Sequence, residues 1–272
     1  MAAGRLVRTL LLLFGVSVAS LPAFSEDDSV RLPLLVTGRF ADSAGYELRV
    51  SAYLPAGISA EPTETLLVDR VQQVDSDRFG PVRRSVPVLL CLVPEAEYAS
   101  PISDRSPYRP LVLREAQEAN PIVVAVAAIP PFDDESGHSV SAMIQLLDDL
   151  LAAIPDVDPG RVYLTGYAAA TALVWRLAAS VPHRVAAAVP ISGSGDPGDA
   201  RRLAGVPIWA LHATVDPAPV LASREMVAAL WAVGSHRIRY TEYKRGGAHS
   251  WERAWEDPLL VSWLFSQFRT RR

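Results

Sequence analysis

Cysteine is almost absent from this sequence, since Cys91 is the only one among 272 residues. No disulfide can form within the chain, so its fold depends on a hydrophobic core, for which 50 % hydrophobic residues supply the material. Cys91 lies within a continuous apolar run, residues 86–93. We expect it to be buried among apolar side chains and unreactive.

An excess of positive charge is missing as well. The formal net charge is -4, and lysine and arginine do not gather into stripes, which excludes the usual electrostatic footprint of a nucleic-acid-binding protein. Three arginines close the sequence, Arg269, Arg271 and Arg272, and we expect them to form a solvated tail.

Metal-ligand spacing is not found either. Four histidines lack the required spacing to acidic residues or to one another: His138, His183, His212 and His236. We therefore expect them to be surface or packing residues and expect no metal and no other cofactor. No oligomeric state is predicted.

No hydrophobic run is long enough to cross a bilayer comfortably, because the N-terminal run covers residues 10–19 and a spanning helix needs about 20 residues. Arg5 and Arg8 precede this run, and the small residues Ala23 and Ser25 follow it. This arrangement is typical of a secretory signal peptide. We expect residues 1–25 to be that peptide and residues 26–272 to form one secreted or periplasmic domain. An uncleaved anchor is the alternative.

The first part of the expected domain has the pattern of antiparallel strands. Apolar and polar residues alternate over residues 46–54, as in a strand with one face buried, and residues 32–37 and 66–74 are further predicted strands. Residues 86–93 and 122–129 are instead continuously apolar and rich in branched side chains. That pattern is typical of strands covered on both faces.

Helix and strand then alternate to the end of the chain. The predicted helices cover residues 139–154, 168–180, 223–233 and 258–268, and the predicted strands cover residues 161–165, 186–191, 207–212 and 237–243. Such alternation predicts an α/β fold with a doubly wound, mainly parallel sheet that begins with antiparallel strands.

One strand–turn–helix junction lacks a serine. The stretch LTGYAAATALVW, residues 164–175, reads as the end of a strand, a tight turn and the start of a helix. In many hydrolases this turn is written G-x-S-x-G, and the serine at its tip is the nucleophile. Here the tip is Ala168. We predict that the strained turn is kept, with Ala168 outside the ordinary negative range of φ, because strand and helix still pack as before.

Two residues downstream could complete a catalytic triad. Asp216 follows the predicted strand in WALHATVDPAPV, and His249 lies beyond the last predicted strand in TEYKRGGAHSW. The carboxyl ends of parallel strands meet at one edge of the sheet, so we expect both to lie near Ala168. The order nucleophile, acid, histidine is that of the α/β-hydrolase triad. An exposed histidine and a simple turn-forming Asp are the alternatives.

Four segments carry a family resemblance. DPGRVYLTGYAAA is similar to the strand and elbow, and LAASVPHRVAAAVPISGSGDP to the helix and strand that follow, of secreted α/β-hydrolases. PIWALHATVDP resembles their H-G-x-x-D segment and YTEYKRGGAHSWERAW their G-x-G-H segment. From about residue 87 onward the chain thus resembles prolyl-oligopeptidase-like and polyhydroxybutyrate-depolymerase-like or feruloyl-type esterases. The resemblance implies the α/β-hydrolase fold, with Asp216 and His249 as triad members.

Three departures from the family pattern suggest lost chemistry. Ala168 replaces the serine, Ala170 replaces the second glycine of the elbow, and CLVPEA stands where the family writes H-G. Pro94 in that loop has no N–H to offer an oxyanion, although the backbone N–H of Ala169 remains as a candidate donor. A non-catalytic homologue, a pseudoenzyme, is the interpretation favoured by these changes.

Two alternatives stay open. An active carboxylic-ester hydrolase would need another nucleophile, for which the nearby hydroxyls are Thr171, Ser192 and Ser194, although each also fits a purely structural role. A pseudoenzyme could bind a small-molecule or ester-like ligand in the old cleft, or be an interaction protein with a filled cleft. Three aromatic residues could line a cleft or belong to the core: Phe132, Trp251 and Trp255.

Overall fold

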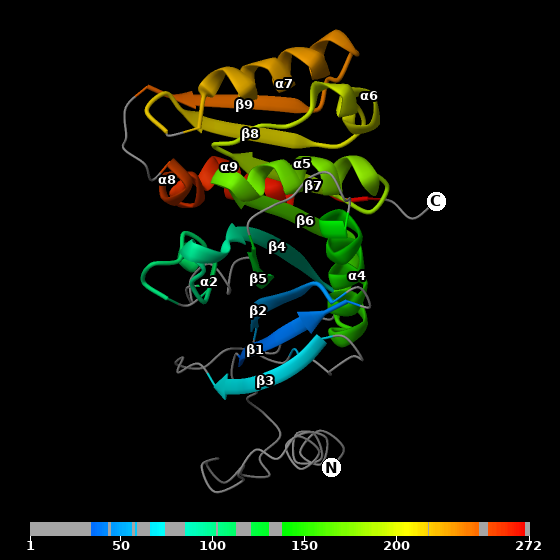
Figure 1. Cartoon of the computed structure of the whole chain (residues 1–272), viewed down its shortest axis with the longest axis vertical. Coiled ribbons are helices and arrows are strands. Elements are labelled where there is room, and N and C mark those ends of the chain that lie inside the picture. The colour runs from blue at the N-terminus through cyan, green and yellow to red at the C-terminus, as the bar shows by residue number, and fades with distance from the viewer. Residues whose placement is uncertain are drawn as a thin grey trace, which may run out of the picture. The chain divides into compact units, whose positions relative to one another are not determined.

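A nine-stranded sheet organises the part of the chain that the structure describes (Figure 1). The computed structural model describes residues 34–42, 45–55, 58, 66–73, 85–101, 103–112, 121–130, 138–216, 218–244 and 250–269. All of them belong to one unit, Arg31–Arg272. The predicted signal peptide, residues 1–25, lies outside the described residues.

The sheet has an antiparallel and a parallel part. The strands are β1 (Leu34–Ala41), β2 (Glu47–Leu54), β3 (Leu66–Gln73), β4 (Val86–Pro94), β5 (Val123–Ile129), β6 (Val157–Tyr167), β7 (Ala187–Ile191), β8 (Ile208–Ala213) and β9 (Ile238–Tyr243). Their order across the sheet is β3-β1-β2-β5-β4-β6-β7-β8-β9. The pairs among β1, β2 and β3 and the pair β2–β5 are antiparallel, whereas every other pair is parallel.

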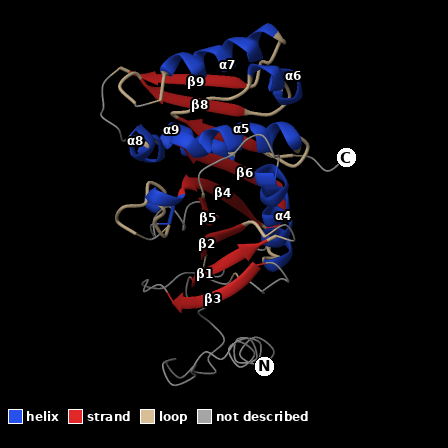
Figure 2. Ribbon diagram, viewed as in Figure 1, coloured by secondary structure: helices blue, strands red, loops and turns tan. Residues whose placement is uncertain are grey.

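Helices cover both faces of the parallel part (Figure 2). On one face, the core includes side chains of α4 (His138–Ala153), α5 (Thr171–Ser180), α6 (Ala200–Leu203) and α7 (Val220–Ala232). On the other face, it includes side chains of α2 (Arg109–Val112), α8 (Ser250–Glu256) and α9 (Pro258–Phe265). Short 3₁₀ turns lie at η2 (Glu95–Glu97), η3 (Ala168–Ala170) and η4 (Pro197–Asp199).

Burial confirms the expected patterns. β5 is buried along its whole length and β4 is buried except at Pro94, as the continuous apolar runs at residues 86–93 and 122–129 predict for strands covered on both faces. The side chain of Cys91 is fully buried, and burial raises the pKa of its thiol well above the usual value. The predicted α/β architecture with a mainly parallel sheet is therefore confirmed, including the antiparallel start of the sheet.

Arg269 contradicts the prediction of a solvated tail. Its Nε donates to the carbonyl of Val185 (2.9 Å) and its Nη2 to that of Pro182 (2.6 Å), while its backbone N–H donates to the carbonyl of Gly160 (2.7 Å). Partial burial, with the nearby charge of Arg237, lowers the pKa of the Arg269 guanidinium. Arg269 thus supplies hydrogen-bond donors to the backbone carbonyls of Gly160, Pro182 and Val185, and buried backbone carbonyls require such partners. Arg271 and Arg272 lie outside the described residues.

Candidate functional site

The junction between β6 and α5 keeps the predicted strained turn. Tyr167 is extended, with φ -134°, and Ala168 then has φ 52°, in the left-handed region that residues with a Cβ avoid. Gly166 is required just before the turn, because a Cβ there would lie 2.7 Å from Val174 Cγ2 and 2.8 Å from the carbonyl oxygen of Leu92. The prediction that this turn is kept is thus confirmed.

The side chains of the turn offer little chemistry. Ala168 is half-buried and packs against the core, and Ala169 is exposed, with its N–H at the first turn of the helix. Ala170, in place of the second family glycine, is buried. Thr171 is also buried, and its hydroxyl donates to the carbonyl of Ile191 (2.7 Å), so it faces the neighbouring strand and not the tip of the turn.

The turn that follows β7 packs directly against this junction. Ser192 has φ 54°, a second non-glycine residue in the left-handed region. At Gly193 a Cβ would lie 2.4 Å from Thr171 Cβ and 2.7 Å from the carbonyl oxygen of Ala168. Only glycine fits there, and the close approach locks the two strand ends together.

Asp216 is joined to that turn. The hydroxyl of Ser192 donates to Asp216 Oδ2, and the same oxygen accepts the backbone N–H of Ala213 (3.0 Å). The chain of contacts from Asp216 through Ser192 and Gly193 reaches the carbonyl of Ala168. The structure therefore brings the predicted acid to the edge of the sheet that carries the turn. Reasoning from the sequence considered Ser192 as a possible nucleophile or as a turn residue and missed its bond to Asp216.

His249 lies outside the described residues, but its neighbours on both sides are described. Trp251, two residues later in α8, stacks on Tyr167 with ring centroids 4.5 Å apart. Before it, the backbone N–H of Thr214 donates to the carbonyl of Tyr243 at the end of β9 (3.0 Å). Of the described residues on either side, Tyr243 thus lies beside the Asp216 loop and Trp251 lies beside the turn at Ala168.

The loop after β4 lies near the same turn. Pro94 ends the strand and has no N–H, and Glu95, Ala96 and Glu97 are exposed. The hydroxyl of Tyr167 donates to the carbonyl of Glu97 (3.4 Å). The predicted oxyanion loop is therefore adjacent to the turn, with a proline at its first position.

The three aromatic residues expected either in a cleft or in the core fall in different places. Trp255 is buried and meets Tyr108 edge to face, with ring centroids 5.6 Å apart, so it belongs to the core. Trp251 is half-buried beside Tyr167. Phe132 lies outside the described residues.

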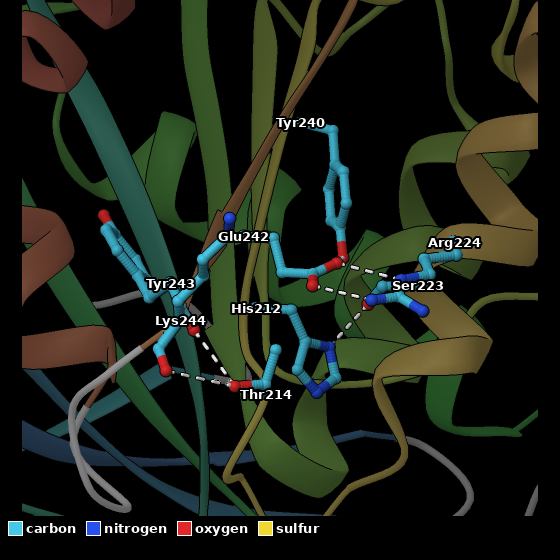
Figure 3. A network of polar contacts seen from close by, with 8 residues as sticks. All are labelled: His212, Thr214, Ser223, Arg224, Tyr240, Glu242, Tyr243 and Lys244. Carbon is cyan, nitrogen blue, oxygen red and sulfur yellow. Dashed lines mark hydrogen bonds and ion pairs between the residues drawn. The ribbon is translucent and has the colours of Figure 1, made fainter.

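Polar side chains form a network around His212 and Glu242 (Figure 3). His212 is fully buried, as expected of a packing residue, with Nδ1 2.8 Å from the Ser223 hydroxyl and Nε2 3.0 Å from the carbonyl oxygen of Ala218. The Ser223 hydroxyl also lies 2.9 Å from the carbonyl oxygen of Gly193. Of the other histidines, His183 and His236 are exposed. The side chain of His138 lies outside the described residues.

A charged pair borders this network on β9 and α7. The guanidinium of Arg224 donates to both carboxylate oxygens of Glu242 (2.7 and 2.9 Å), and the Tyr240 hydroxyl donates to one of them (2.9 Å). The bonds from Arg224, joined by that from Tyr240, lower the pKa of Glu242 to about 2. Burial, together with the Glu242 carboxylate, raises the pKa of Tyr240 to about 12.

Two further observations concern metals and membranes. Within the described residues, no three His, Cys, Asp or Glu side chains gather as a metal site requires. No helix in the described ranges has both the length and the apolar character to cross a bilayer.

Solved structures with similar folds are esterases and related hydrolases. A thermostable esterase matches with a TM-score of 0.66 and 26% sequence identity, over 86% of this chain and 63% of its own. A putative dienelactone hydrolase from Klebsiella pneumoniae subsp. pneumoniae MGH 78578 matches with a TM-score of 0.54 and 16% identity, over 85% of this chain and 99% of its own. A ferulic acid esterase matches with a TM-score of 0.56 and 11% identity, over 86% of this chain and 98% of its own.

The chain therefore has the α/β-hydrolase fold, and the structures to which it is similar include esterases. It spans less than two thirds of the thermostable esterase and 44% of the acylaminoacyl peptidase of Pyrococcus horikoshii, to which it is also similar (TM-score 0.59, 12% identity). No protein-family model and no curated protein matches the sequence.

Proposed function

We propose that this protein is an exported, non-catalytic esterase homologue in which Ala168 occupies the position of the nucleophilic serine. The observation that supports this most strongly is the left-handed φ of 52° at Ala168. That backbone geometry presents a side chain at the tip of a strand-to-helix turn, where active relatives need an oxygen. A methyl group cannot attack a carbonyl carbon.

The expected loss of rate is large. Removing the serine of a triad costs roughly 10⁶ in turnover in a well-studied protease, and the catalysis that remains comes from the oxyanion hole and substrate binding. Losing one oxyanion donor costs about another 10²–10³. Pro94 cannot donate at the start of the loop after β4, and the remaining candidate donors are the N–H groups of Glu95, Ala96 and Ala169. With both changes the chain is left with negligible turnover.

The retained parts suggest binding of a ligand. Asp216 is still supported by two donors, and half-buried Tyr98 and Trp251 pack on the same face of the sheet as Ala168. The ligand proposed for this site is a small molecule of the ester type. Filling of the site by the chain's own side chains would instead point to an interaction protein. Export rests on the signal-peptide pattern of residues 1–25.

An active hydrolase with a different nucleophile is the second candidate, and one observation bears on it. Thr171 and Ser192 are both buried and donate to Ile191 and Asp216, whereas Ser194, on the turn after β7, is exposed. Ser194 is therefore the hydroxyl on which the alternative depends.

A comparison of three purified variants with the wild type tests the proposal. Short aryl esters should be hydrolysed by the wild type no faster than by the Ser194→Ala variant. The Ala168→Ser variant should hydrolyse them at least about tenfold faster than the wild type, because it regains the attacking oxygen. Adding Asp216→Asn to Ala168→Ser should remove that gain, because the acid orients the general base. Turnover by the wild type that disappears in Ser194→Ala would establish the second candidate.

A further inference from the structure

We propose that Ser192, His212 and Ser223 are positioning residues that hold the Asp216 loop from two sides. The inference rests on the proposed function only in giving Asp216 a role at the site. The contacts form a closed ring. Ser192 bonds to Asp216, and the next residue, Gly193, contacts Ser223 through its carbonyl oxygen. Ser223 contacts His212, and the other ring nitrogen of His212 lies beside the carbonyl oxygen of Ala218 in the Asp216 loop.

The first side of the ring is a hydroxyl in a strained place. Ser192 has φ 54°, a left-handed backbone conformation in which serine is less stable than glycine. The next residue in the chain is Gly193. Its hydroxyl is buried and donates to the Asp216 carboxylate. A serine in this conformation is accounted for by that bond, because glycine would satisfy the backbone alone but has no donor to offer.

One carboxylate oxygen receives both donors. Asp216 Oδ2 accepts the Ser192 hydroxyl from the neighbouring strand end and the Ala213 N–H from its own turn (3.0 Å). Two donors from different directions fix the plane of a carboxylate, whereas one leaves it free to rotate. Hydrogen bonds to a charged acceptor are also stronger than those between neutral groups.

The second side of the ring, formed by His212 and Ser223, contacts the loop at Ala218, two residues after Asp216. Nε2 of His212 lies 3.0 Å from the carbonyl oxygen of Ala218, within hydrogen-bond distance. The other ring nitrogen lies 2.8 Å from the Ser223 hydroxyl, which lies 2.9 Å from the carbonyl oxygen of Gly193. His212 is fully buried, so these contacts exchange little with water. The loop is thereby tied at Asp216 and at Ala218 to the same turn after β7.

Amide hydrogen exchange measures this positioning without any substrate. The N–H of Ala213 donates to Asp216 Oδ2, so its exchange rate reports whether the carboxylate stays in place. The amides of β6 in the same sample report global stability. The backbone N–H of Asp216, which donates to the carbonyl of Ala213 (3.0 Å), reports on the loop itself.

Two substitutions of one residue separate the hydroxyl from the backbone strain. Ser192→Ala keeps the strained residue and removes the hydroxyl, whereas Ser192→Gly removes both the hydroxyl and the strain. Both should speed exchange at Ala213 by about tenfold, as expected for loss of a hydrogen bond to a charged group. The β6 amides of Ser192→Gly should exchange no faster than those of the wild type. A purely structural serine would give the opposite pattern in the glycine variant, with Ala213 unchanged or better protected.

The coupling to Asp216 and to His212 is tested in the same way. In an Asp216→Ala background, Ser192→Gly should have no further effect at Ala213, because the acceptor is already gone. Ser223→Ala and His212→Gln should speed exchange at the Asp216 amide, with the smaller effect in His212→Gln, which keeps an amide donor near Ala218. His212→Leu should exceed both, and if it does not fold, the other variants still decide.

The proposal is overturned if Ala213 exchanges at the wild-type rate in both Ser192 variants, or if every change at residues 213–216 is matched by an equal change in β6. These outcomes are independent of the proposed function. An active wild-type enzyme would end the pseudoenzyme proposal and leave the ring intact, whereas unchanged exchange would remove the ring and leave the question of activity as it stands.

Discussion

Trp251 stacks on Tyr167, with ring centroids 4.5 Å apart and ring planes inclined by 12°. Tyr167 immediately precedes Ala168, and Trp251 follows His249 by two residues. The contact therefore joins the start of α8 to the turn at Ala168. It is the closest described link between the turn and the segment that holds the predicted triad histidine.

Removing this stack should loosen α8. Trp251→Ala should lower the free energy of unfolding by about 1–3 kcal/mol, since it loses a half-buried indole and an aromatic pair. Trp251→Phe should retain most of the stability because it keeps an aromatic face on Tyr167. Urea denaturation checks both, with Trp231→Ala as the control, because Trp231 is 60% exposed and should change stability by less than about 0.5 kcal/mol. Equal effects of the two alanine variants would contradict the role of the stack.

Because the backbone at Ala168 is strained, we expect substitution by glycine at this position not to reduce stability. Ala168→Gly should leave stability unchanged or raise it by up to about 1 kcal/mol, because relief of the left-handed conformation outweighs the added freedom of the unfolded chain. Ala169→Gly, one residue later and without a positive φ, should cost about 0.5–1 kcal/mol. Thermal unfolding of the pair tests this, and a loss at both positions would mean that position 168 is unstrained.

Glu242 gives a pH-dependent contribution of known sign. Its pKa of about 2 in the folded protein lies below the usual value of 4.5, so its stabilisation is complete above about pH 4.5 and is lost as the pH falls toward 2. Glu242→Gln should therefore be less stable than the wild type at pH 7, by about 1 kcal/mol or less for a pair this close to solvent. The difference should shrink steadily in urea titrations between pH 5 and pH 2.5. A difference that stays constant with pH would show that packing, and not the ion pair with Arg224, is responsible.

Arg269 should contribute to stability despite its place near the end of the chain. Arg269→Met keeps much of the aliphatic stem and removes the donors to Val185 and Pro182, and should cost about 1–3 kcal/mol. Arg202→Met is the matched control, because the Arg202 side chain is 71% exposed, and should fall within about 0.5 kcal/mol of the wild type. Chemical denaturation of the two variants tests the prediction. If both substitutions change the free energy of unfolding by the same small amount, Arg269 belongs to a solvated tail, as its position in the sequence suggests.

Local pattern predicted most of the fold. The alternation over residues 46–54 reappears only in part in β2. Its predicted apolar face is buried and Glu47 and Arg49 are exposed, but Ser51 and Tyr53, which the alternation assigned to the open face, are buried as well because the core covers that face too. The segment expected at residues 161–165 is in fact the longer β6 (Val157–Tyr167). Asp158 and Gly160 have the composition of a turn, and the backbone N–H of Gly160 does bond to Asp158 Oδ1 (2.8 Å) within the strand. Pairing of Val157 with Val86 overrides that turn signal.

α8 was not predicted, although a signal for it exists. Trp251, Ala254 and Trp255 recur at helical spacing, and the last two are buried in the core. Three residues are too few to stand out in a periodicity count, and only packing on β8 and α9 makes the helix evident.

The candidate site also has features that the sequence predicted and features that it did not. The junction at Ala168 and the position of Asp216 followed from strand–turn–helix order, because the ends of parallel strands share one edge of the sheet. The bond from Ser192 to Asp216 and the stack of Trp251 on Tyr167 join residues 24 and 84 positions apart, and no local pattern encodes which long-range partners a hydroxyl or a ring will meet. For the same reason His212 could be predicted to pack, but not to hold the carbonyl of Ala218.

The most direct measurement is the intact mass of the purified protein after incubation with a serine-reactive fluorophosphonate, with Ala168→Ser treated in parallel. The account predicts that the wild type keeps its unmodified mass, while Ala168→Ser gains one phosphonyl group on residue 168. Stoichiometric modification of any wild-type side chain would show that the chain carries an activated nucleophile after all and would contradict the account.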